Sequence, residues 1–335
     1  MSKKERAKMK AIRVNDDKSL EWVEFPDPVL RDDQVLIKVA YAAVNRADLM
    51  QREGCYPPPP GCPDIMGLEV AGTITAMGET AAKSGRVKLG DKVCALLGGG
   101  GYAEYAAVRY DMTMPIPEGC TMEEAAAMPE AFATAYLNLF IEGGLKAGDV
   151  FLMHAGASGL ASVVIPMAKA FGAYVITTII DESKRSEVAK TGADLIVNTK
   201  TEDIVEVLKR FDEEERPVSL AIDCLGGEVM GKCLPHLAYM AKWIMIATLA
   251  GDFTTIDMRK LYVRNVRVVG STLRSKPEDR KARILKSLTE QVWSRVSSGE
   301  IRPTICKLLP ITEAEAAHAL LYEGKSTGKV VLKVE

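Results

Sequence analysis

The fold of this chain is decided by one stretch, Val150-Phe151-Leu152-Met153-His154-Ala155-Gly156-Ala157-Ser158-Gly159-Leu160-Ala161. A short apolar run that leads through small residues into a second apolar segment is typical of a buried strand that turns directly into a helix. Gly156 and Gly159 let the backbone turn sharply and approach a pyrophosphate, which the free N–H groups of a helix N-terminus bind. The stretch therefore predicts a dinucleotide-binding turn, in which Ala161 takes the third small position and Pro166 bends the helix.

Strands and helices alternate along the chain from this turn onward. Strands are expected at Val150–His154, Tyr174–Thr178, Leu195–Asn198, Leu220–Asp223, Lys242–Ala247 and Arg267–Ser271, and helices at Gly159–Phe171, Glu182–Thr191, Thr201–Phe211 and Val229–Leu237. This alternation predicts an α/β fold with a doubly wound parallel sheet, the Rossmann pattern. Two further elements do not fit the six strands of that pattern: a long amphipathic helix at Pro277–Ser298 and a last strand at Lys329–Val334. We therefore expect the C-terminus to return to the first domain.

The first third of the chain is β-rich. Short strands are expected at Ala11–Val14, Glu21–Phe25, Val35–Val44, Glu69–Met77, Lys92–Leu97 and Glu104–Val108. Glycine and proline turns between them favour a partly closed antiparallel barrel or a sandwich. A capping box, Thr121 to Glu124, opens an alanine-rich helix that is expected to run to about Glu142. We therefore expect a β-rich domain at residues 9–124 and 272–335 and a Rossmann domain at residues 125–271.

The composition excludes several classes of protein. A chain of 335 residues is long enough for two domains, and a net charge of −2 leaves no excess of basic side chains to bind nucleic acid. The basic opening Lys3–Lys10 lacks the apolar segment of a signal peptide, and no apolar run has the length of a membrane span. The seven cysteines are scattered, which favours structural thiols in a reducing compartment. We expect a cytoplasmic protein with a short leader and neither nucleic acid nor membrane as a partner.

The choice of dinucleotide depends on the residues that follow the second strand. A carboxylate from Asp181 or Glu182 would bind a ribose 2′-hydroxyl, whereas Lys184 or Arg185 would attract a 2′-phosphate. The same residues could instead start the next helix and form its solvated face. On balance the two basic residues favour NADPH over NADH.

The chain also carries a series of ordered motifs. They are Asn45 to Arg52, Gly67-Leu68-Glu69-Val70-Ala71-Gly72, Gly90-Asp91-Lys92-Val93, Met114-Pro115-Ile116-Pro117, Ala125 to Pro129, His154 to Gly159, Asp223-Cys224-Leu225-Gly226-Gly227 and Gly328-Lys329-Val330-Val331-Leu332. In these motifs the chain resembles the medium-chain dehydrogenase/reductase superfamily, specifically its zinc-free quinone oxidoreductase branch. The resemblance extends over nearly the whole chain from Met9. It implies that the β-rich domain is a GroES-like, partly open barrel that carries the catalytic residues.

Two positions in these motifs bear on metal chemistry. The zinc-dependent alcohol dehydrogenases of the superfamily have a cysteine where this chain has Asn45 and a histidine where it has Leu68. Asparagine and leucine supply neither a thiolate nor an imidazole. The clustered cysteines of their structural zinc are also absent from the region Lys92–Met112. The resemblance therefore implies hydride transfer without zinc.

The resemblance implies that reduced nicotinamide delivers hydride to a quinone or an α,β-unsaturated carbonyl held in the cleft between the domains. Asn45, Asp48 and Tyr56 would be the catalytic residues. Asn45 and Asp48 have an alternative role as a turn or helix cap, and Tyr56 could simply pack its loop. The histidines at 154, 236 and 318 are dispersed and expected to be structural, so no general acid is identified and the final proton could come from water.

Cofactor contacts are implied at a further set of positions. These are Thr134, Gly156, Ala157, Ser158, Gly159, Leu160, Lys184, Arg185, Leu225, Ala247, Leu273 and Arg274. Thr134 could instead bond back to its own helix, and Arg274 could be a surface arginine at a domain junction. The family commonly has a tyrosine beside the adenosine, but this chain reads Val197-Asn198-Thr199-Lys200, where Lys200 adds positive charge.

Three functions remain open from the sequence. The first is an NADPH-dependent quinone or enone reductase, and the second is an enoyl-thioester reductase of a fatty-acid or polyketide pathway. The third is a cofactor-binding protein without turnover, such as a redox sensor, an RNA binder or a structural protein. The resemblance also implies a homodimer formed through the last Rossmann strand, around Val266–Ser271.

Overall fold

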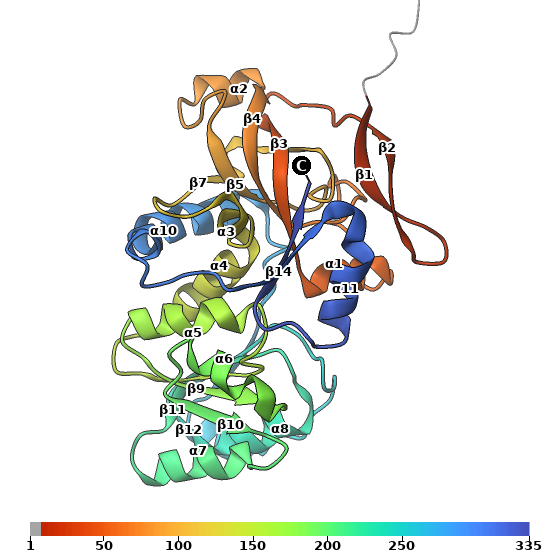
Figure 1. Ribbon diagram of the computed structural model, residues 1–335. Helices are drawn as coiled ribbons and strands as arrows, with labels where there is room; N and C mark the ends of the chain where they lie inside the picture. Colours follow the sequence, from red (N-terminus) through yellow and green to blue (C-terminus); the bar gives the residue numbers. More distant parts are fainter. Residues whose placement is uncertain (1–7, 335) are drawn as a thin grey trace, which may run out of the picture. The chain divides into compact units, whose positions relative to one another are not determined.

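A computed structural model describes residues 8–334 of the chain (Figure 1). The chain divides into two compact units, of which the second comprises Thr134–Leu273 with Glu300–Arg302 and the first comprises the rest of the described chain. The division falls inside helix α4 (Pro129–Tyr136), whereas the sequence placed it at residues 124 and 125. The expected leader at Lys3–Lys10 lies outside the described residues except for its last three.

The second unit is built on a six-stranded sheet with the order β10-β9-β8-β11-β12-β13. Its strands are β8 (Val150–Met153), β9 (Tyr174–Ile179), β10 (Leu195–Asn198), β11 (Val218–Asp223), β12 (Leu237–Met245) and β13 (Arg267–Gly270). Every neighbouring pair is parallel. This is the expected Rossmann sheet, and its strand order changes direction between β8 and β11, where such sheets bind ligands beyond the carboxyl ends of the strands.

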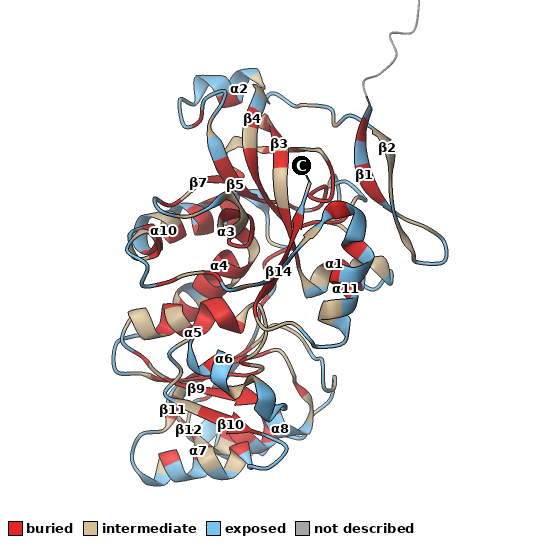
Figure 2. Cartoon of the chain, viewed as in Figure 1, coloured by how far each residue is buried: buried red, intermediate tan, exposed pale blue. Residues whose placement is uncertain are grey.

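Helices cover both faces of this sheet, as a doubly wound fold requires. They are α5 (Ala161–Ala170), η3 (Glu182–Lys184), α6 (Arg185–Ala189), α7 (Ile204–Glu213), α8 (Gly227–Cys233), η4 (Leu234–His236) and α9 (Met258–Val263). Figure 1 draws α5 and α6 on one side of the sheet and α7 and α8 on the other. α5 is largely buried and continues through Pro166 (Figure 2).

The first unit contains a seven-stranded sheet with the order β14-β15-β3-β4-β5-β7, together with β6 on β3 and a separate hairpin of β1 and β2. The strands are β1 (Lys8–Val14), β2 (Leu20–Pro26), β3 (Gln34–Val44), β4 (Glu69–Met77), β5 (Lys92–Leu96), β6 (Tyr105–Arg109), β7 (Thr113–Pro115), β14 (Ile305–Pro310) and β15 (Lys329–Lys333). All pairs are antiparallel except β14 with β15. β15 pairs with β3, so residues near the end of the chain complete this sheet.

The helices of the first unit are α1 (Arg46–Arg52), α2 (Glu79–Lys83), η1 (Tyr110–Met112), α3 (Met122–Ala126), α10 (Glu278–Ser297), η5 (Ile311–Glu313) and α11 (Ala314–Tyr322), with α4 beginning in this unit. The sequence predicted α10 and the start of α3 but not α1, α2, η1, η5 or α11. No helix of the described chain combines the length and apolarity of a membrane span.

The single alanine-rich helix predicted from Thr121 to Glu142 is wrong. The capping box is present, since Glu124 N–H donates to the Thr121 hydroxyl over 3.2 Å and Thr121 N–H donates to the Glu124 carboxylate over 2.8 Å. However, α3 ends at Ala126, α4 starts at Pro129, and a π-helical segment, η2 (Leu137–Glu142), follows. Proline has no N–H to donate to a preceding turn, so it ends one helix and suits the first position of the next.

Helix α10 buries one face within the first unit (Figure 2). Ile284, Leu285, Leu288, Val292 and Val296 follow the helical repeat and are buried. The Trp293 indole N–H donates to the Pro115 carbonyl over 2.7 Å, and its ring meets Phe132 edge to face at 6.0 Å. α10 is thus fixed against α4, whose first residues belong to the same unit.

Candidate functional site

The glycine turn after β8 presents unpaired backbone donors. Gly156 N–H donates to the Thr178 carbonyl over 2.7 Å, and the Ser158 hydroxyl accepts from Ala161 N–H at the start of α5. The N–H groups of Ala157, Gly159 and Leu160 donate to no acceptor in the described part of the chain. Donors of this kind at a helix N-terminus bind phosphate oxygens. The turn is therefore built to hold an anion.

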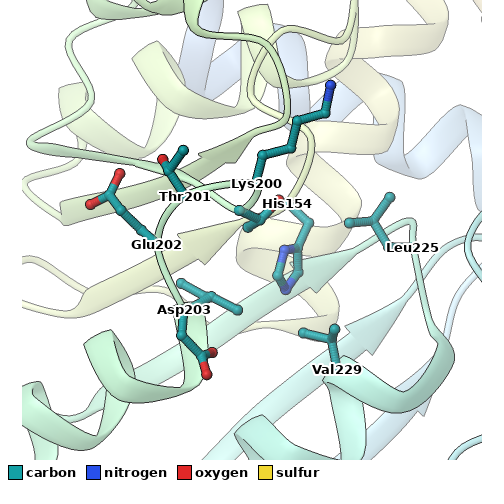
Figure 3. A pocket seen from close by; sticks show the side chains of 9 residues that line it. His154, Lys200, Thr201, Glu202, Asp203, Leu225 and Val229 are labelled. Atoms are coloured by element: carbon teal, nitrogen blue, oxygen red, sulfur yellow. The ribbon is translucent and has the colours of Figure 1, made fainter.

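A cavity of about 380 Å³ opens beside this turn at the carboxyl ends of β8, β10 and β11 (Figure 3). It is lined by His154, Thr199, Lys200, Thr201, Glu202, Asp203, Ile204, Leu225 and Val229. The position is the one where a doubly wound sheet takes the nucleoside part of its ligand. Leu225, a predicted contact, lies in this cavity.

The sequence did not assign His154 to the cavity, although it lies at a strand end. The residue is buried, and its Nδ1 is 3.1 Å from the Thr178 hydroxyl. Burial lowers the pKa of this histidine, so it is neutral at pH 7. A neutral imidazole can accept a hydrogen bond from a nucleoside or donate one to it.

Asp223, at the end of β11, shapes the loop that carries Leu225. One of its carboxylate oxygens accepts from Leu225 N–H over 2.7 Å and from Gly226 N–H over 3.2 Å. The other oxygen accepts from the Trp243 indole N–H over 2.9 Å. The carboxylate is buried but fully hydrogen-bonded, so it fixes the loop beside the cavity.

The basic residues after β9 differ in how they are held. The Arg185 guanidinium pairs with Glu182, lies 3.4 Å from Glu202 and donates to the Ile196 carbonyl over 2.7 Å. All of these partners of the guanidinium belong to the second unit. Lys184 and Lys200 both lie near Asp181 and lower the pKa of its carboxyl, behind the larger effect of its hydrogen bonds from Ser183.

A second group of polar residues lies within the first unit around a buried ion pair. The Lys329 ammonium is 2.6 Å from the Glu69 carboxylate and 2.6 Å from the Asn45 side-chain oxygen. The Asn45 amide donates to Glu69 over 2.9 Å. Lys329 and Glu69 are 3% and 0% exposed. The predicted residue Asn45 is thus oriented by two charged partners that the sequence analysis did not identify.

Asp48 is buried next to Asn45. Its carboxylate accepts from Asn45 N–H over 2.8 Å, from Gly67 N–H over 3.1 Å and from the Tyr102 hydroxyl over 3.2 Å. Burial raises the pKa of Asp48 to about 6. The bond to Asn45 N–H is half of the capping box of α1, the alternative role considered for this pair.

Tyr56 and Arg274 lie together in the first unit. The Arg274 guanidinium carbon is 5.0 Å from the centre of the Tyr56 ring. The guanidinium donates to the Tyr56 carbonyl, to the Gln51 side-chain oxygen and to the Gly98 carbonyl, over 3.0, 2.5 and 3.0 Å. Arg274 is buried, so the alternative of a surface arginine is excluded.

The remaining predicted contacts lie in the second unit. Thr134 and Ala247 are partly exposed, and Leu273 is buried. The Thr134 carbonyl accepts from the Asn138 amide over 2.8 Å. Within the described residues, no three side chains of the usual metal-binding types lie close enough together to hold a metal ion.

His318 predicts how the first unit responds to acid. It is buried, its Nε2 is 3.3 Å from the Tyr102 hydroxyl, and burial lowers its pKa to about 3. In the unfolded chain this histidine binds a proton below its ordinary pKa of about 6.5, whereas in the folded chain it stays unprotonated down to about pH 3. The free energy of unfolding should therefore fall by about 1.4 kcal/mol per pH unit between about pH 6.5 and pH 3 because of this residue.

Replacement of His318 by phenylalanine should remove this slope and keep the ring contact with Tyr102. Urea unfolding at a series of pH values measures it, with the partly exposed His236→Phe as the matched control. A H318F variant with the same pH slope as the parent chain would contradict the prediction.

Comparisons with known proteins agree with this geometry. Residues 31–118 match the model of the alcohol dehydrogenase GroES-like domain, and residues 159–290 match that of the zinc-binding dehydrogenases. The quinone oxidoreductase of Mus musculus is 27% identical over 97% of both chains. The lovastatin diketide synthase of Aspergillus terreus is 28% identical over 91% of this chain, which spans 12% of that protein. Among solved structures, the quinone oxidoreductase of Thermus thermophilus, studied also with NADPH, is 28% identical with a TM-score of 0.81, over 97% of this chain and 100% of that one.

Proposed function

We propose that this chain, which belongs to the medium-chain dehydrogenase/reductase superfamily of oxidoreductases, transfers hydride from NADPH to a quinone or an α,β-unsaturated carbonyl. The observation that carries the proposal is the row of unpaired N–H groups at Ala157, Gly159 and Leu160 beside the nucleoside-sized cavity. The dinucleotide would supply the hydride, and the protein would orient it and exclude water. Similarity to quinone oxidoreductases over the full length supports the choice of acceptor.

We propose further that no zinc takes part. Leu68 has no ligand atom and is buried, and the Asn45 oxygen already accepts from the Lys329 ammonium. A second cation close to this ammonium would be repelled. The donor set therefore does not fit the catalytic metal of the alcohol dehydrogenases.

The proposed roles of the first unit follow from these contacts. Tyr56 and Asn45 would contact the acceptor, with Asn45 held by Glu69 and Lys329. Asp48 has no exposed surface, so we assign it a positioning role. It holds Asn45 and Gly67 through their backbone N–H groups.

The test of the function is NADPH consumption by the purified chain with a panel of quinones and enones, in the presence and absence of a zinc chelator. Turnover that the chelator leaves unchanged is the expected result. Absence of turnover with every acceptor would refute the proposal. A second candidate is an enoyl-thioester reductase, favoured by the similarity to the lovastatin diketide synthase, and turnover of enoyl thioesters with quinones inert would select it.

The choice between NADPH and NADH gives a sharper prediction. Lys184 and Lys200 both act on the carboxyl of Asp181, after the strand β9, and we propose that they contact the ribose 2′-phosphate. The Arg185 guanidinium pairs with Glu182 and Glu202. Changing Lys184 and Lys200 to alanine should weaken NADPH binding about tenfold or more and leave NADH binding unchanged, since a charge-assisted phosphate contact contributes about 1.4 kcal/mol or more.

Fluorescence titration with each dinucleotide measures this difference. Lys190→Ala is the matched control, because Lys190 is an exposed lysine of the same region that pairs with Glu187. A parent chain that binds NADH more tightly than NADPH would mean that Asp181 or Glu182 faces the ribose.

We also propose that the chain forms a homodimer through β13. This strand ends the six-stranded sheet, and Val268 on it is 42% exposed. Tyr239, Phe253 and Tyr262 of the same unit are 67%, 87% and 66% exposed. An unpaired edge, in a unit that also exposes aromatic side chains, is a site where a second copy can extend the sheet.

The combined change of Val268 and Tyr262 to lysine should convert the dimer to a monomer, because it places charges on the strand and beside it. Sedimentation velocity measures the outcome. Tyr322→Lys is the control, since this tyrosine is 79% exposed but belongs to the first unit. A parent chain that sediments as a monomer would refute the proposal.

A further inference from the structure

Lys281 is a charged residue on the buried face of helix α10. It lies one helical turn before Leu285 and two before Leu288, on the face that the helix buries, and it is 5% exposed. Its ammonium has no hydrogen bond or ion pair with any residue that the structure describes. Lysine is almost never buried without a partner, because the charge loses its hydration. Burial accordingly lowers the pKa of Lys281.

The acid whose charge acts most strongly on Lys281 is Glu130, in the first turn of α4. The two helices are fixed to each other by the contact of Phe132 with Trp293. Glu130 N–H donates to the Glu69 carboxylate over 2.8 Å, which places Glu130 beside the buried ion pair of Glu69 and Lys329. The Glu130 side chain is partly buried, and its carboxyl oxygens make no hydrogen bond within the described residues.

The surroundings of Glu130 favour its protonated form. Burial and the negative charge of Glu69 raise its pKa to about 7, against the opposing charges of Lys329 and Lys281. The charged and titratable groups that surround it come from several elements: Glu69 of β4, Asp48 of α1, Lys329 of β15, Lys281 of α10, and Tyr56 from the segment after α1. Arg274 acts on both Tyr56 and Lys281, and Cys62 and Glu278 act on Lys281. Burial raises the pKa of Tyr56, and the negative charge of Glu130 raises it further.

The other two acids of this group, Glu69 and Asp48, already accept hydrogen bonds from neighbouring residues. Glu69 accepts from Lys329, Asn45 and Glu130 N–H. Asp48 accepts three hydrogen bonds and has no exposed surface. Only Glu130 combines partial exposure with carboxyl oxygens free of hydrogen bonds to the described chain.

From this arrangement we propose that Glu130 is the general acid of the reaction and that Lys281 positions and tunes it. The inference rests on the proposed function. When bound, the dinucleotide would supply hydride with its electron pair to the β-carbon of an enone, and an enolate and the oxidised dinucleotide would result. The Glu130 carboxyl gives its proton to that enolate, the O–H bond of the acid breaks, and the resulting carboxylate is reprotonated from water.

The pH dependence of kcat with an enone tests the proposal. The parent kcat should fall above about pH 7, where Glu130 loses its proton. In Glu130→Gln, kcat should fall by about 10² or more and lose this dependence, while the affinity for NADPH stays unchanged. Glu130→Asp should restore part of kcat. Glu118→Gln is the matched control, because Glu118 is an exposed acid of the same unit.

Lys281→Met gives a second, independent readout. Loss of the neighbouring positive charge should move the alkaline limit of kcat upward by about one pH unit, since a nearby cation favours the carboxylate. Lys286→Met is the control, because Lys286 is an exposed lysine of the same helix that lies 3.9 Å from Glu290. An E130Q variant with the parent pH profile and kcat would overturn the proposal and leave the proposed function intact.

A protein without turnover toward any acceptor would instead refute the proposed function. The protonation of Glu130 can still be measured in that case. Carbon NMR of glutamate-labelled protein, with E130Q to assign the signal, follows its titration directly. A Glu130 carboxyl that titrates near pH 7 supports the assignment. One that titrates near the ordinary value of about 4.3 overturns it.

Discussion

Replacement of Lys329 by methionine is expected to lower the free energy of unfolding of the first unit by about 3–5 kcal/mol, the cost of leaving one charge of a buried pair without its partner. The uncompensated charge would be the Glu69 carboxylate, which is 0% exposed and would keep hydrogen bonds only from Asn45 and the Glu130 backbone. Methionine retains most of the volume of lysine, so the loss would report charge rather than packing.

Urea unfolding followed by circular dichroism measures this loss, and a double variant separates its causes. Adding Glu69→Gln to K329M removes the stranded charge and should recover a large part of the stability. Lys8→Met is the control, because Lys8 pairs with Glu24 on the surface, where both side chains are 63% exposed. Exposed pairs contribute about 0–1 kcal/mol. A K329M variant within about 1 kcal/mol of the parent chain would contradict the prediction.

Gly156→Val is expected to weaken NADPH binding by about a hundredfold, equivalent to about 3 kcal/mol. A Cβ atom at this position would lie 2.4 Å from the Thr177 hydroxyl oxygen, 2.9 Å from the Thr177 methyl and 3.2 Å from a methyl of Val188. Thr177 cannot give way, since it is buried and its hydroxyl donates to the Met153 carbonyl over 2.7 Å. The turn itself must move, and the N–H groups that would bind the pyrophosphate move with it.

Gly270→Val is the matched control for this change. A Cβ atom on Gly270 meets no atom of its own chain within 4 Å, so the same side chain is added without a clash inside the protomer. Because Gly270 ends β13, the strand of the proposed dimer, sedimentation velocity must first show that this control keeps the oligomeric state of the parent chain. Fluorescence titration with NADPH measures both variants. Equal affinities for the two would show that the turn does not hold the cofactor.

The Rossmann unit could be predicted closely because its signals are local. The glycine turn, the apolar runs and the helical repeats each occupy a few adjacent residues, and each strand from β8 to β13 overlaps its expected range. β12 is the largest departure, because it begins at Leu237 rather than at Lys242. The alanine-rich helix was misjudged because its composition favours a helix throughout, whereas one residue, Pro129, prevents a continuous one.

The candidate site in the first unit was predictable only in part. Asn45, Asp48 and Tyr56 were named from motifs, but their partners are far away in the sequence. Lys329 reaches Asn45 because β15 pairs with β3 in the register that sets Val330 opposite Val44. A strand register between segments so distant along the chain depends on the whole sheet and leaves no local pattern.

The charged partners of the second unit show the same limit. Arg185 was expected to attract a phosphate, and a basic residue in that position is a reasonable candidate. The sequence could not show that Glu182 and Glu202 enclose its guanidinium.

Lys281, on helix α10 of the first unit, could not be distinguished by sequence from the other basic residues of that helix, because only the structure shows that it is buried.

The position of β15 also governs the order in which the chain can fold during synthesis. β15 lies between β14 and β3, so the larger sheet lacks an inner strand until residues 329–333 have left the ribosome. All six strands of the other sheet, by contrast, come from one continuous segment that is complete at residue 270. The second unit can therefore fold first, while the edge of β3 that β15 will cover is still unpaired. An unpaired strand edge is a template for pairing with another chain, so the first unit is expected to be more prone to aggregation than the second until its last strand is added.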